Sequence, residues 1–224
     1  MQYSIITQLT NLFELHRNAE QAIQKSMYMK NKVSFFGIKQ PLRVALQKPL
    51  FNSYPINTLD QLTDIIMQCW QQEKREYHYT ATDLVLHYKN LWQPHIIDLI
   101  EFCIITHSWW DTVDDLAASG AGIVCKKFPE LICVMDKWIE SPNMWLRRSA
   151  LLFQLKYKKD TDKEKLFIYC KKVMHEKEFF IRKAIGWVLR EYSKTNPSAV
   201  YQFLMEHDNA LAGLSKREAS KYLK

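Results

Sequence analysis

Segment 106–115 carries the side chains best suited to chemistry on a cation. Trp110 and Asp114 stand four residues apart, so they share one face of a predicted helix. An indole attracts a cation through its quadrupole, and a carboxylate attracts it by direct charge. Trp109 and Val113 share the adjacent face and look like core residues. A purely structural interpretation stays open, with Trp110 in the core and Asp114 as a helix cap or salt-bridge partner.

Two later helical stretches carry further residues of this kind. Arg147 and Arg148 follow one period after Trp110, and Trp187 and Arg190 lie on neighbouring faces of the next stretch. If these helices point the same way, one surface combines tryptophan, carboxylate and arginine. Helices that only pack against each other do not need that combination.

The number of residues between these helical stretches predicts the fold. Trp110, Trp145 and Phe180 are 35 residues apart, and each opens a similar helical pattern. A period near 35 with two helices per unit is typical of stacked helical hairpins, as in HEAT-type arrays. We therefore predict an all-α fold, a superhelical α-solenoid of HEAT-like hairpin repeats. It should form one domain over residues 1–224, with a concave binding face.

The local pattern agrees with this fold class. Apolar residues recur at helical spacing, and no stretch shows a convincing strand alternation. We expect about twelve helices, with the longest loops at 31–40 and 49–57. The small residues at 119–122 predict a tight turn between helices; the alternative is a backbone that approaches a phosphate closely.

Composition excludes several classes of protein. The 224 residues are 47% apolar and 13% aromatic, which argues against disorder. Five glycines are few for a nucleotide-binding fold that uses glycine-rich phosphate loops. Five irregularly spaced cysteines fit neither a disulfide framework nor a zinc ribbon. We expect most of the cysteines to be buried thiols, and we expect no metal or organic cofactor, no membrane span, and a monomer in the cytoplasm.

The excess of positive charge is concentrated in the last third of the chain. The whole chain carries a net +7, whereas residues 147–224 hold 18 basic and 9 acidic side chains. Such a surface suits a polyanion such as nucleic acid, although a lysine-rich solvated face would look the same. The residues predicted to contact DNA are Arg147, Lys156, Lys158, Arg182, Lys183 and Arg190.

At these residues the sequence resembles a known family. The segments at 108–114 (SWWDTVD), 145–148 (WLRR) and 183–192 (KAIGWVLREY) are similar to the DNA alkylation repair enzymes of the AlkD type. Residues 28–31, 35–38 and 214–219 extend the resemblance, in order, over nearly the whole chain. It implies a HEAT-like superhelix that clamps duplex DNA. It also implies a monofunctional glycosylase that removes cationic N3- and N7-alkylated purines while the base stays stacked.

The resemblance also implies roles for particular residues. Trp110, Asp114 and Trp187 correspond to the lesion-facing cleft, and Arg148 to a supporting catalytic arginine. Tyr28 corresponds to a residue near the lesion, and we assign it to substrate binding together with Trp109. Cleavage of the C1′–N9 bond builds positive charge on the sugar, which indoles and a carboxylate stabilise.

Two other functions share part of this pattern. A non-catalytic helical-repeat module that binds DNA or protein would have the same fold, period and charge. Only the joint presence of Trp110, Asp114, Arg148 and Trp187 separates it from an enzyme. A base-flipping glycosylase of the helix-hairpin-helix class would need a glycine-rich hairpin, for which Gly120 and Gly122 are poor candidates.

Overall fold

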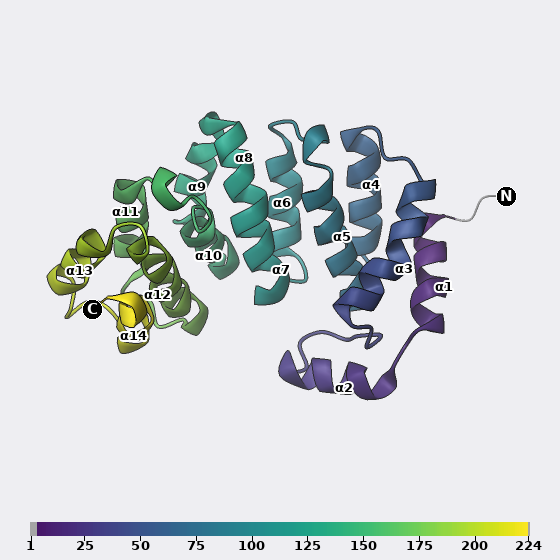
Figure 1. The fold of residues 1–224 in the computed structure, drawn as a ribbon, viewed down its shortest axis with the longest axis horizontal. Helices are drawn as coiled ribbons and strands as arrows, with labels where there is room; N and C mark the ends of the chain where they lie inside the picture. Colours follow the sequence, from purple (N-terminus) through teal and green to yellow (C-terminus); the bar gives the residue numbers. More distant parts are fainter. Residues whose placement is uncertain (1–3, 224) are drawn as a thin grey trace. The chain divides into compact units, whose positions relative to one another are not determined.

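The computed structural model describes residues 4–223, and these residues confirm the all-α prediction. They form the helices α1 to α14 with short loops and a single isolated bridge between Ser34 and Lys74 (Figure 1). The backbone divides into two compact units, Met1–Gln93 and Pro94–Lys224. The expected single repeat domain over residues 1–224 stays a prediction.

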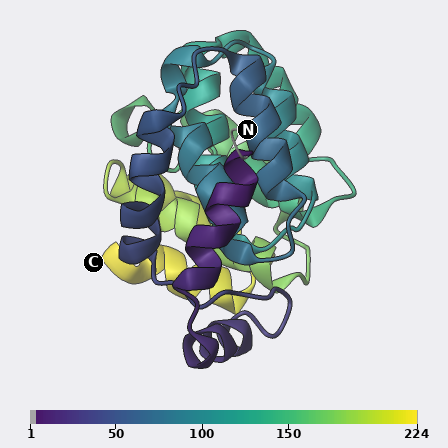
Figure 2. The ribbon, with the colours of Figure 1, turned by 90° about the vertical axis from the view of Figure 1, so that its right-hand side faces the viewer.

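The first unit contains five α-helices and one 3-10 turn. They are α1 (Ile5–Leu15), α2 (Ala19–Tyr28), α3 (Gln40–Ser53), α4 (Leu59–Trp70), α5 (Arg75–His87) and the turn Lys89–Leu91. Helix α1 lies between α3 and α4 and packs against both (Figure 2). The ring of Phe13 on α1 also packs against Phe36 of the loop before α3 and Tyr77 of α5, and the three centroids lie 5.4–5.7 Å apart. Helix α2 has no buried residue.

The loop expected at 31–40 is present, whereas the one expected at 49–57 is partly wrong. The first loop is held by the buried Glu76 carboxylate, which accepts backbone N–H groups of Phe36, Gly37 and Ile38 at 2.9–3.1 Å. At the second site α3 continues to Ser53 with Pro49 inside it. One missing N–H does not end this helix, because the next residue still packs into the core.

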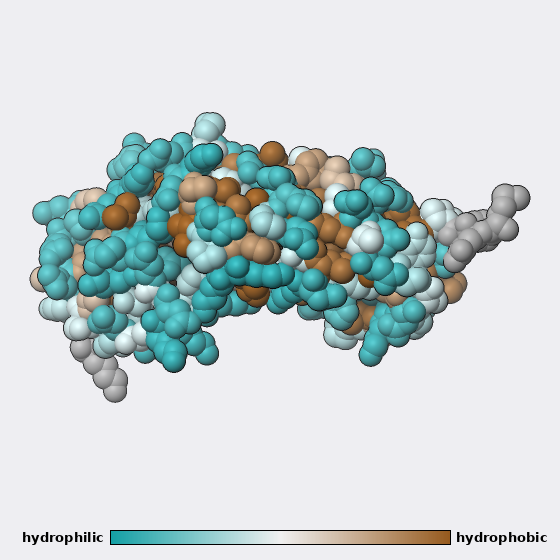
Figure 3. Space-filling model, turned by 90° about the horizontal axis from the view of Figure 1, so that it is seen from above, coloured by the Kyte–Doolittle hydropathy of each residue, from teal (hydrophilic) through white to brown (hydrophobic). Residues whose placement is uncertain are grey.

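The second unit contains the remaining helices. They are α6 (Ile96–Ile105), α7 (Trp110–Asp115), a π-helical segment (Leu116–Ala121), α8 (Gly122–Lys127), α9 (Ile132–Trp138), α10 (Met144–Leu152), α11 (Lys163–Val173), α12 (Phe179–Ser193), α13 (Pro197–Glu206) and α14 (Gly213–Ala219). Three 3-10 turns, Pro129–Leu131, Lys158–Asp160 and Ser220–Tyr222, complete it. Much of its surface in Figure 3 is hydrophilic, with smaller apolar patches between.

The small residues at 119–122 do not form the predicted turn. They continue a helical stretch that runs from Trp110 to Lys127 with the π segment in its middle. All six residues of that segment are buried. A Cβ at Gly120 would meet Ile100 at 3.4 Å, and one at Gly122 would collide with the Phe153 carbonyl. The small residues therefore permit close packing rather than a change of direction.

The 35-residue period corresponds to helices that pack side by side. Helix α10 contacts both α7 and α12, and α12 packs against α14 (Figure 1). These four helices begin at residues 110, 144, 179 and 213. The period seen in the aromatic residues thus extends to a fourth helix, which lacks the aromatic marker.

Most of the cysteines are buried, as the sequence predicts. Cys69, Cys103, Cys125 and Cys170 are buried, and burial raises the pKa of each thiol. Cys133 is exposed. Among the described residues, no helix is long and apolar enough to cross a membrane.

Helix α14 approaches α12 closely at Gly186. A Cβ at this position would lie 2.5 Å from the Glu218 Cβ and 2.9 Å from the Ser215 carbonyl oxygen. Neither atom can move without shifting α14. At Gly213, by contrast, the nearest atom to an added Cβ is the end of the Arg217 side chain at 3.7 Å.

We therefore predict opposite outcomes for two glycine substitutions. Gly186→Ala should destabilise the fold by roughly 1–3 kcal/mol, because it overpacks the α12–α14 contact. Gly213→Ala should be neutral or slightly stabilising, because alanine favours the helix and has room. Thermal unfolding of the two variants beside the wild type measures the difference. Equal melting temperatures for both variants would contradict the close contact.

Candidate functional site

An ion pair between α7 and α10 forms the centre of the candidate site. Arg148 donates through Nε to Asp114 Oδ1 at 2.7 Å and through Nη2 to Oδ2 at 2.8 Å. Its Nη1 donates to the carbonyl oxygen of Phe180 on α12 at 2.5 Å. The Arg148 side chain is 4% exposed and that of Asp114 16%. One guanidinium therefore joins three successive repeat helices.

Local sequence fixes the register of both helices. Trp109 is extended (φ −155°, ψ 156°), and α7 begins directly after it, so Asp114 falls one turn into the helix. The Asn143 side chain accepts the backbone N–H of Trp145 at 2.8 Å and caps α10. This cap places Arg148 on the second turn of α10, where it reaches α7.

An aromatic cluster supports the ion pair. The rings of Trp109, Trp145 and Phe180 lie with centroids 5.0–5.8 Å apart, one from each repeat. The Arg148 guanidinium stands 5.7 Å from the Phe180 centroid. Trp109 Nε1 is buried with no hydrogen-bond partner among the described atoms. The structure thus places Trp109 in an aromatic cluster with Trp145 and Phe180, and the Phe180 ring contacts Arg148.

The other two tryptophans predicted for the site lie on α7 and α12. Trp110 is half-buried and precedes Asp114 by one turn, so the two side chains share a face of α7. Trp187 is half-buried on α12, seven residues after Phe180. Seven residues make about two turns, or about 10 Å, so Trp187 lies on the side of α12 that bears Phe180.

The Asp114 carboxyl sits in a partly dry environment. Burial raises its pKa above the ordinary value of 3.8, and the neighbouring Asp111 and Asp115 act in the same direction. The hydrogen bonds and charge of Arg148 act against this rise. A carboxylate with little solvent around it interacts more strongly with a nearby cation than one in water.

The predicted basic residues have different partners. Arg147 forks onto Glu176 at 2.8 Å, and Arg182 donates to the Glu176 carbonyl at 2.9 Å. Lys156 donates to Ser119 at 2.5 Å, while Lys158 is exposed.

Lys183 and Arg190 both bind Glu218. The sequence did not predict Glu176 and Glu218 as the ion-pair partners of these basic residues. Glu218 follows Lys183 by 35 residues, so the repeat period could have indicated it.

Tyr28 belongs to the first unit. It is the last residue of α2, and its side chain is exposed. Among the described residues, no group of three or more His, Cys, Asp or Glu side chains gathers that could hold a metal ion.

Fold and site together define a helical-repeat protein with a carboxylate–arginine pair beside tryptophans. Residues 9–223 match the family model for DNA alkylation repair enzymes. The structure is similar to a predicted DNA alkylation repair enzyme from Enterococcus faecalis, with 34% identity and a TM-score of 0.85 over 92% of this chain and 96% of that one. The chain belongs to the DNA alkylation repair enzyme family and has a role in repairing alkylated DNA.

A second solved structure shows the fold alone. It is a Streptococcus mutans protein, 16% identical, with a TM-score of 0.65 over 99% of this chain and 100% of that one. No curated protein matches the chain significantly.

Removal of Arg148 should change the titration of Asp114. In Arg148→Ala the hydrogen bonds and positive charge that lower the Asp114 pKa are lost, while its burial largely remains. The pKa should therefore rise further, so the carboxyl becomes protonated at a higher pH than in the wild type. Carboxyl carbon NMR shifts followed through a pH titration measure this. An unchanged Asp114 pKa would show that the fork does not form in solution.

Proposed function

We propose that this protein is a monofunctional DNA glycosylase that acts as a monomer on duplex DNA. It removes cationic N3- and N7-alkylated purines and leaves an abasic site. The observation that carries the proposal is the Asp114 carboxylate, held by the Arg148 fork on the same helix face as Trp110. Membership of the family supports the DNA substrate.

The chemistry follows from the charge of the lesion. Alkylation at N3 or N7 makes the purine a cation and a good leaving group, so the C1′–N9 bond breaks without an acid to protonate the base. Positive charge then develops on the deoxyribose. A fixed carboxylate stabilises this charge without having to reorganise. Normal bases lack the departing positive charge, and the same site leaves them intact.

Arg148 supports this role by orienting the carboxylate. The fork occupies one acceptor position on each oxygen of Asp114. A carboxylate has about four such positions, so two remain for a water molecule or the sugar. In this proposal Asp114 stabilises the sugar cation and holds the attacking water, while Trp110 and Trp187 present indole faces to the lesion nucleotide. The proposal also assigns a substrate contact to Trp109 in this unit and, separately, one to Tyr28 in the first unit, and the base stays stacked during excision.

A second candidate function explains the same ion pair. A carboxylate satisfied by arginine is a common structural bridge, and here it joins α7 to α10. A non-catalytic module that binds DNA would keep this bridge and lack excision.

One assay separates the two functions. The purified protein is incubated with duplex DNA that contains N7-methylguanine, and free base is measured. Base release above the spontaneous rate, unchanged by a chelator, supports the cofactor-independent glycosylase. DNA binding without release favours the non-catalytic module. Loss of activity with a chelator, restored by added metal, would contradict the absence of a cofactor.

Asp114→Asn tests the role of the carboxylate. The substitution keeps the shape but removes the charge, so single-turnover excision should fall about a hundredfold. DNA affinity should hold or rise slightly. Stability should fall as well, by roughly 1–3 kcal/mol, because the buried Arg148 charge loses its ionic partner.

Asp115→Asn is the matched control. It removes the same charge from the next, exposed position of α7. Its excision rate should equal that of the wild type at a temperature where all variants are folded. Wild-type excision by Asp114→Asn would show that Asp114 is structural.

Binding to undamaged duplex DNA should depend strongly on salt and little on sequence. The reason is the excess of positive charge in residues 147–224. Neutralising about five phosphates gives a slope of roughly −4 to −5 in a plot of log affinity against log salt. Fluorescence anisotropy across a salt series measures the slope. A slope near zero would contradict binding through phosphates.

A further inference from the structure

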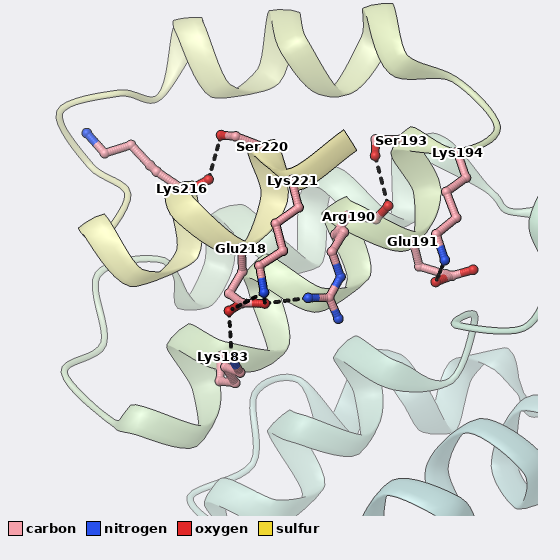
Figure 4. Close-up of polar contacts among 9 residues, drawn as sticks. All are labelled: Lys183, Arg190, Glu191, Ser193, Lys194, Lys216, Glu218, Ser220 and Lys221. Atoms are coloured by element: carbon pink, nitrogen blue, oxygen red, sulfur yellow. Dashed lines mark hydrogen bonds and ion pairs between the residues drawn. The ribbon is translucent and has the colours of Figure 1, made fainter. Parts of the chain in front are cut away.

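Three cationic side chains converge on one carboxylate at the C-terminal end of the second unit. Glu218 accepts from Lys183 at 2.7 Å, from Arg190 at 2.5 Å and from Lys221 at 3.1 and 3.2 Å (Figure 4). Lys183 and Arg190 belong to α12, Glu218 to α14 and Lys221 to the turn that follows. The carboxylate on α14 therefore gathers two cations from α12 and one from the turn that follows α14.

The cluster around Glu218 has a buried carboxylate and an excess of positive charge. The Glu218 side chain is 9% exposed, whereas that of Lys221 is 51% exposed. One carboxylate against three cations leaves a net charge of +2. An ammonium has three N–H donors and a guanidinium five, so most donors of the cluster are not used by Glu218. An anion with several oxygen acceptors could use them.

The cations held by Glu218 lie beside a proposed site residue. Lys183, Trp187 and Arg190 occupy positions i, i+4 and i+7 of α12, so they form one stripe along the helix. Trp187 thus lies between the two cations on that stripe. A strand of DNA whose lesion nucleotide faces Trp187 would bring its neighbouring phosphates to them.

We propose that Glu218 is a positioning residue that gathers Lys183, Arg190 and Lys221 into a phosphodiester-binding site on the DNA side of α12. The inference rests on the proposed function for its ligand, which is the backbone of duplex DNA. It assigns a DNA contact to Lys221 and an organising role to a carboxylate.

The direction in which DNA affinity changes when the Glu218 charge is removed tests this proposal. Glu218 carries negative charge, and its removal should by simple Coulomb attraction tighten binding to a polyanion. If Glu218 orders the cations, its removal weakens binding instead, because flexible side chains lose entropy when they bind. The two roles therefore predict changes of opposite direction.

The experiment measures the affinity of Glu218→Gln for an undamaged duplex by anisotropy over a salt series. We expect affinity to fall about tenfold, as for the loss of one charged hydrogen-bonding contact, with a slope less negative by about 1. Asp136→Asn is the control, since it also removes a carboxylate bound to lysine, Lys165 at 2.7 Å. Its affinity should hold or rise slightly. Tighter or unchanged binding by Glu218→Gln would overturn the proposal.

A second pair of variants keeps the test independent of folding. Lys221→Gln alters an exposed side chain, and Lys172→Gln removes a comparable lysine on α11 that pairs with Glu140, just after α9. We expect Lys221→Gln to weaken binding and reduce the salt slope by about 0.9, with a smaller effect for Lys172→Gln. Equal effects of the two variants would contradict a specific site at Lys221.

These measurements are separate from the proposed catalysis. Binding to undamaged DNA requires no base release, so the expected affinities can be found even if N7-methylguanine is not excised. Conversely, excision by a protein whose Glu218→Gln variant binds DNA more tightly would support the glycosylase and overturn the phosphate site.

Discussion

The buried guanidinium of Arg148 is the constraint on which the second unit depends. A charge on a side chain that is 4% exposed must be paired and hydrogen-bonded, or folding carries a large desolvation cost. Asp114 supplies the charge and two acceptors, and the Phe180 carbonyl supplies a third. These partners come from α7 and α12, so α10 cannot shift against either neighbour without leaving the guanidinium unsatisfied.

The same principle recurs two periods further along the chain, between α12 and α14. Arg148 and Asp114 are 34 residues apart, and Lys183 and Glu218 are 35 apart. Each pair joins equivalent helices of adjacent repeats. At the first pair the guanidinium is buried and the charges balance, which orients a carboxylate. At the second the carboxylate is buried and cations are in excess, which suits phosphates. The two pairs thus differ in which partner is buried and in net charge, and we propose a different chemistry for each.

Sequence periodicity predicted the features that depend on local pattern. Helix type, the equivalence of the helices at Trp110, Trp145 and Phe180, and the burial of Val113 all follow from spacing. The structural alternative for Asp114, a salt bridge, is also realised, and its partner is another of the predicted site residues.

The features that escaped prediction depend on packing between helices. The small residues at 119–122 signal a turn in isolation, but here they let Ile100 and Phe153 approach a buried π segment. The partners Glu176 and Glu218 were missed because an ion pair between helices depends on their relative register. For the pair of Lys183 and Glu218, the sequence gives one indication, which is their separation by one full period of 35 residues.

In the proposed function, Asp114 faces the positive charge that develops on the sugar. The most direct test compares two duplexes that differ at one nucleotide, which carries either a cationic aza-sugar or a neutral abasic analogue. The cationic sugar resembles the transition state, so the wild type should bind it roughly a hundredfold more tightly. Asp114→Asn should lose most of that preference. Equal affinity of the wild type for the two duplexes would contradict the account.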